Sequence, residues 1–199
     1  MVSVTLNELE KNMKEYAKAN NVPIMTTSGI NFMTKFIKDN KIKDILEIGT
    51  AIGYSAIMMC SVSDDINITT IERDEKRYLE AIKNIKKAGL EDRIELIYND
   101  ASKIKLDKEY DLIFIDAAKA QNRTFFERFS KNLKEDGYII TDNMNFHGLV
   151  DTAVENIESR NLRQLVRKIK EYKYFLESND TFETEFLEVG DGIAISHRN

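Results

Sequence analysis

The sequence is poor in the residues that mark disulfide-rich, secreted or membrane proteins. Its 199 residues include no Trp, one Pro and one Cys, so no disulfide can form within the chain and nothing indicates an oxidising compartment. Cys60 ends the apolar run 56–60, which predicts a buried structural thiol. Residues 1–15 include several charged side chains, the first at Glu8, and lack the apolar core of a signal peptide. No run approaches the roughly 20 apolar residues of a membrane span. We therefore expect a cytoplasmic protein with no membrane partner.

The composition is that of an ordinary globular protein. Hydrophobic residues make up 42% of the chain and charged residues 32%, which argues against intrinsic disorder. A chain of this length predicts a single domain over residues 1–199. The formal net charge of −5 argues against nonspecific binding of nucleic acid over the whole surface, but it does not exclude a local basic patch.

The order of apolar patterns predicts an α/β fold. Helical spacing over 6–19, and from a Ser28 N-cap to Asp39, predicts an N-terminal helical cap within 1–40. After it, strand-like runs alternate with helical patterns, which predicts crossover connections and a Rossmann-like, doubly wound, mostly parallel sheet. A long helical pattern and two strand-like runs end the chain, which predicts an antiparallel hairpin beside that sheet. The strand-like runs are Asp44–Ile48, Ile66–Ile71, Ile94–Tyr98, Leu112–Ile115, Tyr138–Thr141, Thr181–Leu187 and Gly192–Ser196, and the helical patterns are 53–62, 75–88, 119–133 and 157–176.

A nucleotide-type site is predicted where the first two strands end. Glu47, Gly49 and Gly53 form a glycine turn after the first strand, where open α/β sheets bind ligands and glycine lets the backbone come close. By itself this spacing is a weak signal, and a turn without a ligand explains it equally well. Glu72 ends the second strand and can accept hydrogen bonds from both ribose hydroxyls, although a solvated glutamate is the alternative.

The third strand also ends in polar residues. Asp100 could accept a hydrogen bond from an adenine amino group, and Ala101 could donate through its backbone N–H. An ordinary Asx turn would give the same pattern.

A metal site is predicted where the fourth and fifth strands end. Asp116, Asp142 and Asn143 would converge there, and two carboxylates with an amide suit Mg²⁺, Mn²⁺ or Ca²⁺ better than zinc. Lys119 lies three residues beyond Asp116 and could reach back over the site. The alternative is an exposed residue at a helix start, where a cation is mildly unfavourable.

Together these segments resemble the cation-dependent O-methyltransferase family, which includes catechol and caffeoyl-CoA O-methyltransferases. The matching motifs are LEIGTAIGYSA at 46–56, IERDEKR at 71–77, DLIFIDAAKAQ at 111–121, TDN at 141–143 and VGDGIAIS at 189–196. Further likeness to the bacterial tRNA 5-hydroxyuridine methyltransferases comes from VPIM at 22–25, HGLV at 147–150 and the long basic helix. Asn145 and Glu188 depart from the family pattern, which often has an aliphatic residue or proline there.

The resemblance implies a set of site residues. It implies that S-adenosylmethionine is the methyl donor and that Asp116, Asp142 and Asn143 bind the metal, which we expect to be Mg²⁺, or else Mn²⁺ or Ca²⁺. From the chemistry of methyl transfer, Asp116 and Lys119 are the candidate catalytic residues. The implied donor contacts are Met25, Ser55, Glu72, Asp100, Ala101 and Asp116.

The acceptor is the least determined part of the prediction. Arg160, Arg163, Arg167 and Lys170 recur at helical spacing and form one basic stripe, with Leu162, Leu165, Val166, Ile169 and Tyr172 on the opposite face. A basic stripe is usually a solvated face, but phosphate contacts of this kind position nucleic acid, so the resemblance favours tRNA. A small catechol-like acceptor and a non-catalytic nucleotide-binding regulator are the alternatives. We also expect the N-terminal helices to cap the site or to pair subunits in a homodimer.

Overall fold

The computed structural model describes residues 5–145 and 159–199. Within these ranges, no helix is both long and apolar enough to cross a membrane. The chain divides into two compact units, Met1–Lys105 and Leu106–Asn199, and each is described by itself. The HGLV motif and the first two residues of the expected helix 157–176 lie outside the described residues.

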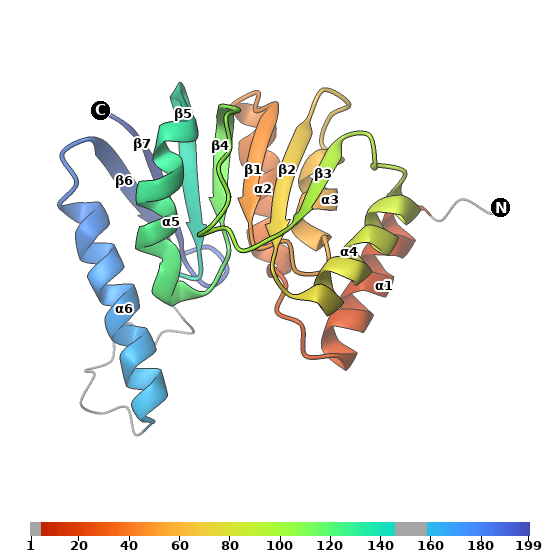
Figure 1. Ribbon diagram of the computed structural model, residues 1–199, viewed down its shortest axis with the longest axis horizontal. Coiled ribbons are helices and arrows are strands. Elements are labelled where there is room, and N and C mark those ends of the chain that lie inside the picture. The colour runs from red at the N-terminus through yellow and green to blue at the C-terminus, as the bar shows by residue number, and fades with distance from the viewer. Residues whose placement is uncertain (1–4, 146–158) are drawn as a thin grey trace. The chain divides into compact units, whose positions relative to one another are not determined.

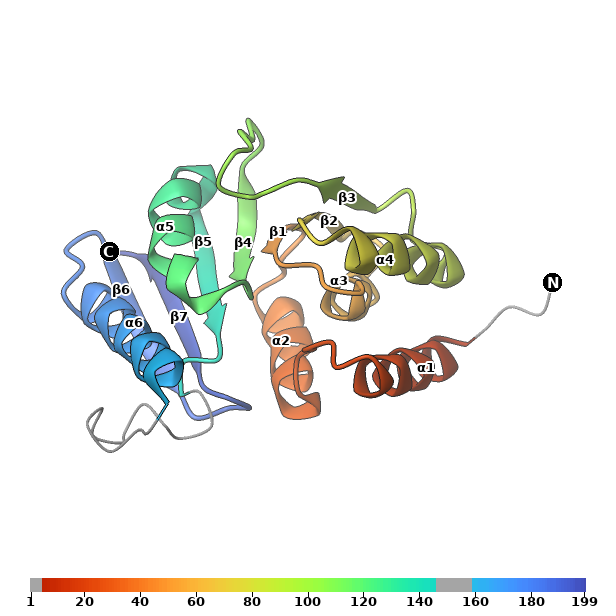
Figure 2. The same ribbon diagram turned by 60° about the horizontal axis from the view of Figure 1, so that its bottom comes forward.

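The N-terminal unit is built on three parallel strands in the order β3-β2-β1. Its elements are α1 (Leu6–Ala19), α2 (Thr27–Asp39), β1 (Asp44–Ile48), α3 (Tyr54–Cys60), β2 (Asn67–Glu72), α4 (Glu75–Ala88) and β3 (Ile94–Tyr98). Helix α4 packs against β2 and β3, and α1 lies beside α4 (Figures 1 and 2). The three strands end on the same edge, which brings Gly49 and Glu72 to one place.

Local capping explains where these helices begin and end. Helix α4 starts after Asp74, whose carboxylate accepts from the Arg77 N–H at 3.0 Å, and it ends at Gly89 in the left-handed conformation. The expected Ser28 cap of α2 is wrong by two residues. The cap is Thr26, which accepts from the Gly29 N–H at 3.1 Å, and Ser28 lies in the first turn.

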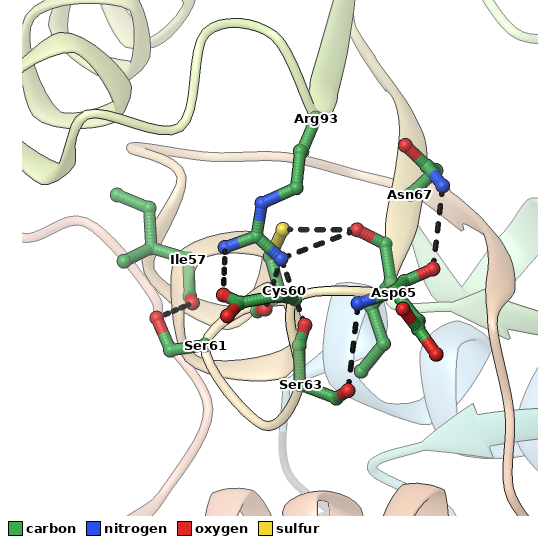
Figure 3. Close-up of polar contacts among 9 residues, drawn as sticks. Ile57, Cys60, Ser61, Ser63, Asp65, Asn67 and Arg93 are labelled. Atoms are coloured by element: carbon green, nitrogen blue, oxygen red, sulfur yellow. Dashed lines mark hydrogen bonds and ion pairs between the residues drawn. The ribbon is translucent and has the colours of Figure 1, made fainter.

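The Arg93 side chain caps the C-terminal end of α3. The Arg93 guanidinium donates to the carbonyl oxygens of Cys60 at 3.1 Å and Ser63 at 2.8 Å (Figure 3). It thereby satisfies carbonyls that a helix end leaves without a partner. Cys60 is buried, as expected, and burial raises the pKa of its thiol. The cysteine therefore belongs to the packing of this unit.

The C-terminal unit has four strands in the order β4-β5-β7-β6. Its elements are β4 (Tyr110–Ile115), the 3-10 turn η1 (Lys119–Gln121), α5 (Asn122–Phe129), the 3-10 turn η2 (Ser130–Asn132), β5 (Leu133–Asp142), α6 (Arg160–Glu177), β6 (Phe182–Leu187) and β7 (Ile193–Arg198). β4 and β5 are parallel, whereas β7 is antiparallel to both β5 and β6. Helices α5 and α6 lie side by side against one face of these strands (Figures 1 and 2). The expected class, a mostly parallel α/β sheet ending in an antiparallel hairpin, is confirmed.

Most boundaries in this unit lie within two residues of the sequence-based expectation, and the larger differences concern the segment 119–133 and the start of β5. The segment 119–133 is not one helix, because 3-10 turns flank α5 on both sides. β5 begins at Leu133 and not at Tyr138. Its first half carries the polar run 134–136, which lacks strand periodicity, yet Leu133 pairs with Tyr110 of β4. The pairing is tertiary, and local sequence does not specify it.

Candidate functional site

The glycine turn follows β1 in the N-terminal unit. Gly49, Ala51 and Gly53 all have positive φ, at 104°, 48° and 83°, a conformation that favours glycine. The turn closes through the Gly53 N–H, which donates to the Thr50 carbonyl at 2.9 Å. Gly53 is the N-cap residue of α3, and because it has no side chain it does not accept a hydrogen bond from the first N–H groups of the helix. The first N–H groups of α3 are thus available to a ligand.

Glu72 holds this turn in place. One carboxylate oxygen accepts from the Ala51 N–H at 2.8 Å. The other accepts from the N–H groups of Arg73 at 2.9 Å and Asp74 at 2.8 Å. An ionised carboxylate has about four acceptor sites, so one remains for a ribose hydroxyl. The geometry adds a structural role to the predicted ribose contact.

Glu47 lies under the same turn and is completely buried. The hydroxyl groups of Ser55 and Thr70 both donate to its carboxylate, and Thr50 shares a 2.6 Å hydrogen bond with Thr70. This network uses the hydrogen of the Ser55 hydroxyl, although the resemblance implied that Ser55 contacts S-adenosylmethionine. Glu47 and Ser55 therefore shape the turn from below, and Thr50 and Thr70 are members that the spacing of motifs did not reveal.

Three further residues predicted to contact S-adenosylmethionine, Asp100, Ala101 and Met25, also lie in this unit, whereas Asp116 lies in the C-terminal unit. Asp100 follows β3 and accepts from the Ser102 N–H at 2.9 Å, which is the Asx turn considered from the sequence. Hydrogen bonds from Ser102 lower the pKa of Asp100, so it is ionised at neutral pH. Ala101 is buried beside it, and Met25 is buried where the chain enters α2. A ligand role for these residues stays a prediction.

The predicted metal ligands come together in the C-terminal unit. Asp116 follows β4, Asp142 ends β5, and Asn143 comes next with a φ of 65°, which Asn tolerates better than most residues. The Asn143 amide lies 3.0 Å from an oxygen of Asp142 and 3.5 Å from Oδ1 of Asp116. The Lys119 ammonium is also 3.5 Å from Asp116 Oδ1, and its side chain is largely buried. Lys119 therefore reaches back over the site.

The charges in this set fit a divalent cation. Burial, and after it the nearby Asp116 carboxylate, raise the pKa of Asp142 to about 7. A cation bound between the two carboxylates would remove that penalty, and rotation of the Asn143 amide would present its oxygen as a third hard ligand. No cluster of three or more His, Cys, Asp or Glu side chains suited to a metal occurs in 5–145 and 159–199, and the set here differs because its third member is an amide.

The structure adds contacts that no motif indicated. The segment after Asp142 is bound to the β6–β7 turn, because the Asn145 N–H donates to the Asp191 carbonyl at 2.7 Å and the Met144 N–H to the Gly192 carbonyl at 2.9 Å. A distant part of the chain therefore holds the segment that follows the predicted metal ligands at the end of β5.

The glycine turn has a similar external support in the N-terminal unit. Tyr54, which opens α3, donates to Glu10 of α1 at 3.1 Å, and Lys14 binds the same oxygen of Glu10 at 2.6 Å. These hydrogen bonds attach the first helix to the element that follows the turn. No motif in the sequence indicates the Tyr54–Glu10 contact, since it joins residues far apart in the chain.

Helix α6 is amphipathic, as the sequence indicated. Val166, Ile169 and Tyr172 are buried, whereas Arg160 and Arg167 are exposed. Arg163 and Lys170 are half-buried and have further interactions of their own. The helix packs against η1, which begins at Lys119. Its basic stripe therefore belongs to the same unit as the predicted metal ligands.

Comparisons with known proteins agree in sequence and in structure. The family model for O-methyltransferases matches residues 1–199. The chain is 29% identical to a caffeoyl-CoA O-methyltransferase of Populus kitakamiensis, over 97% of this chain and 86% of that protein. It is 30% identical to the Stellaria longipes enzyme of the same name, over 94% and 83%.

Solved structures support the same assignment. The crystal structure of a proposed caffeoyl-CoA O-methyltransferase from Staphylococcus aureus is 41% identical, with a TM-score of 0.91 over 96% of this chain and 92% of that one. The Bacillus cereus O-methyltransferase in complex with SAH is 25% identical, with a TM-score of 0.82 over 100% and 94%. Both likenesses span nearly the whole of each chain.

Proposed function

Because this chain belongs to the O-methyltransferase family, we propose that it methylates the O5 hydroxyl of 5-hydroxyuridine in tRNA with the help of a divalent cation. It is an S-adenosylmethionine-dependent O-methyltransferase of the caffeoyl-CoA type. The non-catalytic regulator considered from the sequence is therefore set aside. The acceptor and the metal are the parts of the assignment that we propose.

The reaction sets what the residues of the donor site do. The acceptor oxygen displaces the sulfur from the methyl carbon, so the C–S bond breaks as the O–C bond forms and the sulfonium becomes a neutral thioether. Glu72 holds the glycine turn and accepts from a ribose hydroxyl, while the N–H groups at the start of α3 face the donor. These groups fix the direction of the methyl group, which an in-line displacement requires.

The metal ligands and Lys119 prepare the acceptor. Asp116, Asp142 and Asn143 would hold the cation, which when bound lowers the pKa of the acceptor hydroxyl and orients it. As an ammonium, Lys119 beside Asp116 places a positive charge where the acceptor oxygen becomes an anion. As a neutral amine it would instead accept the proton of the acceptor hydroxyl. A 5-hydroxyuridine base presents its hydroxyl beside the O4 carbonyl, much as a catechol presents two adjacent oxygens.

One observation carries the choice of tRNA. A chain of net charge −5 carries a basic stripe on α6, the helix that packs against the turn containing Lys119, and Arg160 and Arg167 of this stripe are exposed. From Arg160 to Lys170 the stripe runs for about 15 Å along α6 at 1.5 Å per residue, so it could contact neighbouring phosphates of a folded RNA. Phosphate contacts position a substrate without reading its sequence.

A small acceptor is the second candidate, and the names of the relatives favour it. Proteins of similar sequence include caffeoyl-CoA O-methyltransferases and a flavonoid 3',5'-methyltransferase. Coenzyme A also carries phosphates, so a basic stripe alone does not separate a CoA ester from RNA. The two candidates differ in which acceptor is turned over.

The deciding experiment measures both acceptors with one matched pair of variants. Bulk tRNA bearing 5-hydroxyuridine is incubated with protein, S-adenosylmethionine and Mg²⁺, and its nucleosides are analysed by mass spectrometry. Arg167→Glu should raise the KM for tRNA, and the slope of log K against log salt should fall by roughly one counterion or more. Lys168→Glu makes the same charge change on the next residue, about 100° around the helix, and should have a much smaller effect.

Three results would contradict the proposal in different ways. Methylation of catechols or CoA esters with none of tRNA would establish the small-molecule candidate. Equal effects of the two variants on tRNA would leave the stripe as a solvated helix face. The proposal expects chelation to abolish turnover, Mg²⁺ or Mn²⁺ to restore it, and binding of S-adenosylmethionine to persist throughout. Full turnover in excess EDTA would therefore refute the metal dependence.

Two further predictions accompany a tRNA substrate. We expect the enzyme to act in the cytoplasm, as the lone cysteine indicated, and to form a homodimer through its N-terminal helices. Fractionation of cells and light scattering of the purified protein test these expectations separately from the reaction.

A further inference from the structure

A buried pair of hydroxyl groups joins α6 to the strand that carries the metal ligands. Thr141 immediately precedes Asp142 on β5, and its Oγ1 lies 2.9 Å from the Tyr172 hydroxyl. Each residue is only 2% exposed, so neither hydroxyl is shared with bulk water. Burial also raises the pKa of Tyr172, which keeps its proton across the physiological range.

The Tyr172 ring is fixed by aromatic packing. Phe126 of α5 meets it edge-on at 6.4 Å between ring centroids, and Phe175 stacks on it at 6.1 Å. Phe126 in turn packs on Phe182 at the start of β6, at 5.1 Å. The hydroxyl therefore extends from a ring with little freedom.

Hydrophobic burial alone does not require this pair. A Phe and a Val of similar shape would fill the same space without burying polar atoms, and such a replacement of both partners is often nearly neutral for stability. What a hydrogen bond adds is direction, since it fixes the distance and angle between α6 and Thr141. The next residues need such a constraint, because the chain turns sharply at Asn143, where φ is 65°.

We propose that Tyr172 is a positioning residue that holds the end of β5 so that Asp142 and Asn143 are set to bind the metal before it arrives. The inference rests on the proposed metal dependence. It also means that the helix with the basic stripe and the metal ligands are joined by one directional contact.

The test measures metal binding as well as turnover. Tyr172→Phe and Thr141→Val each remove one hydroxyl with little change of shape, and Thr141→Ser retains the hydroxyl. Mn²⁺ affinity is measured by electron paramagnetic resonance of the free ion, and donor binding by calorimetry. Loss of a residue that contacts and orients a metal ligand typically lowers metal affinity 10–100-fold. Tyr172 contacts Thr141, the neighbour of the proposed ligand Asp142, and not the ligand itself. We expect about a 3- to 10-fold loss for Tyr172→Phe and Thr141→Val, near-native affinity for Thr141→Ser, and unchanged donor binding.

A double variant and a control separate positioning from general stability. Tyr172→Phe with Thr141→Val should lose no more Mn²⁺ affinity than either single change, because both remove the same contact. Thr184→Val removes another hydroxyl pair of this unit, with Ser196 at 2.7 Å. It should lower the melting temperature without changing Mn²⁺ affinity.

The outcomes distinguish this inference from the proposed function. Wild-type Mn²⁺ affinity in both single variants, with only a lower melting temperature, would overturn the positioning role and leave the proposed function intact. A wild-type protein that binds S-adenosylmethionine but no Mn²⁺ would overturn the metal dependence and the inference with it. If Tyr172→Phe does not fold, Thr141→Val against Thr141→Ser decides the question.

Discussion

Gly192, in the turn between β6 and β7, offers a sharp test of how the metal ligands are held. Its φ is +85°, and a Cβ added there would lie 2.7 Å from both the backbone nitrogen and the Cγ of Asn145. The neighbouring backbone hydrogen bonds leave Asn145 little room to withdraw. Gly192→Ala must therefore push the segment that follows Asp142.

The expected loss of stability has two parts. A non-glycine residue with left-handed backbone angles costs about 1–2 kcal/mol, and forcing an extra methyl into a packed region costs about 1–3 kcal/mol more. We expect Gly192→Ala to lower the free energy of unfolding by about 2–5 kcal/mol. Gly89→Ala is the matched control, because Gly89 has a φ of +67° but no atom within 4 Å of its Cβ position. It should lose only the first part, about 1–2 kcal/mol.

Urea denaturation gives both free energies, and Mn²⁺ titration reports on the site. Gly192→Ala should weaken Mn²⁺ binding because the displaced segment begins one residue after Asn143, whereas Gly89→Ala should leave it unchanged. Equal losses of stability in the two variants, with native Mn²⁺ affinity in both, would refute the reasoning. Asn145 would then be yielding to the methyl group without disturbing the ligands.

Three other outcomes follow from single residues. Glu72→Ala removes the acceptor of three backbone N–H groups as well as the predicted ribose contact. Calorimetry should therefore show that S-adenosylmethionine binds more weakly by about 1.5–3 kcal/mol, and unchanged binding would count against the ribose contact. Arg93→Ala should destabilise the protein by about 1.5–3 kcal/mol in urea, because the carbonyl groups of Cys60 and Ser63 lose a charged donor, and no loss would mean that water replaces it. The pKa of Asp142 is raised to about 7 in the folded state, so its contribution to the stability of the metal-free protein is complete below about pH 4 and is lost as the pH rises towards 7. Melting curves should show that this loss of stability is smaller with Mn²⁺ bound or in the Asp142→Asn variant. Identical pH profiles of stability for the wild type and the variant would contradict this prediction.

The sequence predicts the fold well where local signals and tertiary packing agree. Strands Asp44–Ile48 and Ile94–Tyr98 and helix Glu75–Ala88 have the expected bounds, because apolar periodicity coincides with caps such as Asp74 and Gly89. Prediction from the sequence fails where a segment becomes a strand only by pairing with a neighbouring strand. The first half of β5 is polar, and Leu133 becomes part of a strand only by pairing with Tyr110.

The site residues show the same division. Asp116, Asp142 and Asn143 could be placed together from sequence, because parallel strands end on one edge of a sheet. The contacts that support them could not. Tyr172 meets Thr141 from 31 positions away along the chain, and its helical periodicity indicates only that it is buried. Asn145 departs from the family pattern, yet no sequence signal links it to Gly192.

The hydrogen bonds of the buried carboxylates distinguish structural from functional acids. Hydroxyl groups of Ser55 and Thr70 donate to Glu47, and three backbone N–H groups donate to Glu72, so protein donors take the place of water around both. Asp142 is equally buried and accepts from Asn143, but burial and the Asp116 charge outweigh this donor and raise its pKa. Such a carboxylate is costly to ionise unless a cation joins it. The fold accepts that cost at Asp116 and Asp142, where we propose that a divalent cation binds, whereas hydrogen bonds from the protein satisfy Glu47 and Glu72 beside the glycine turn.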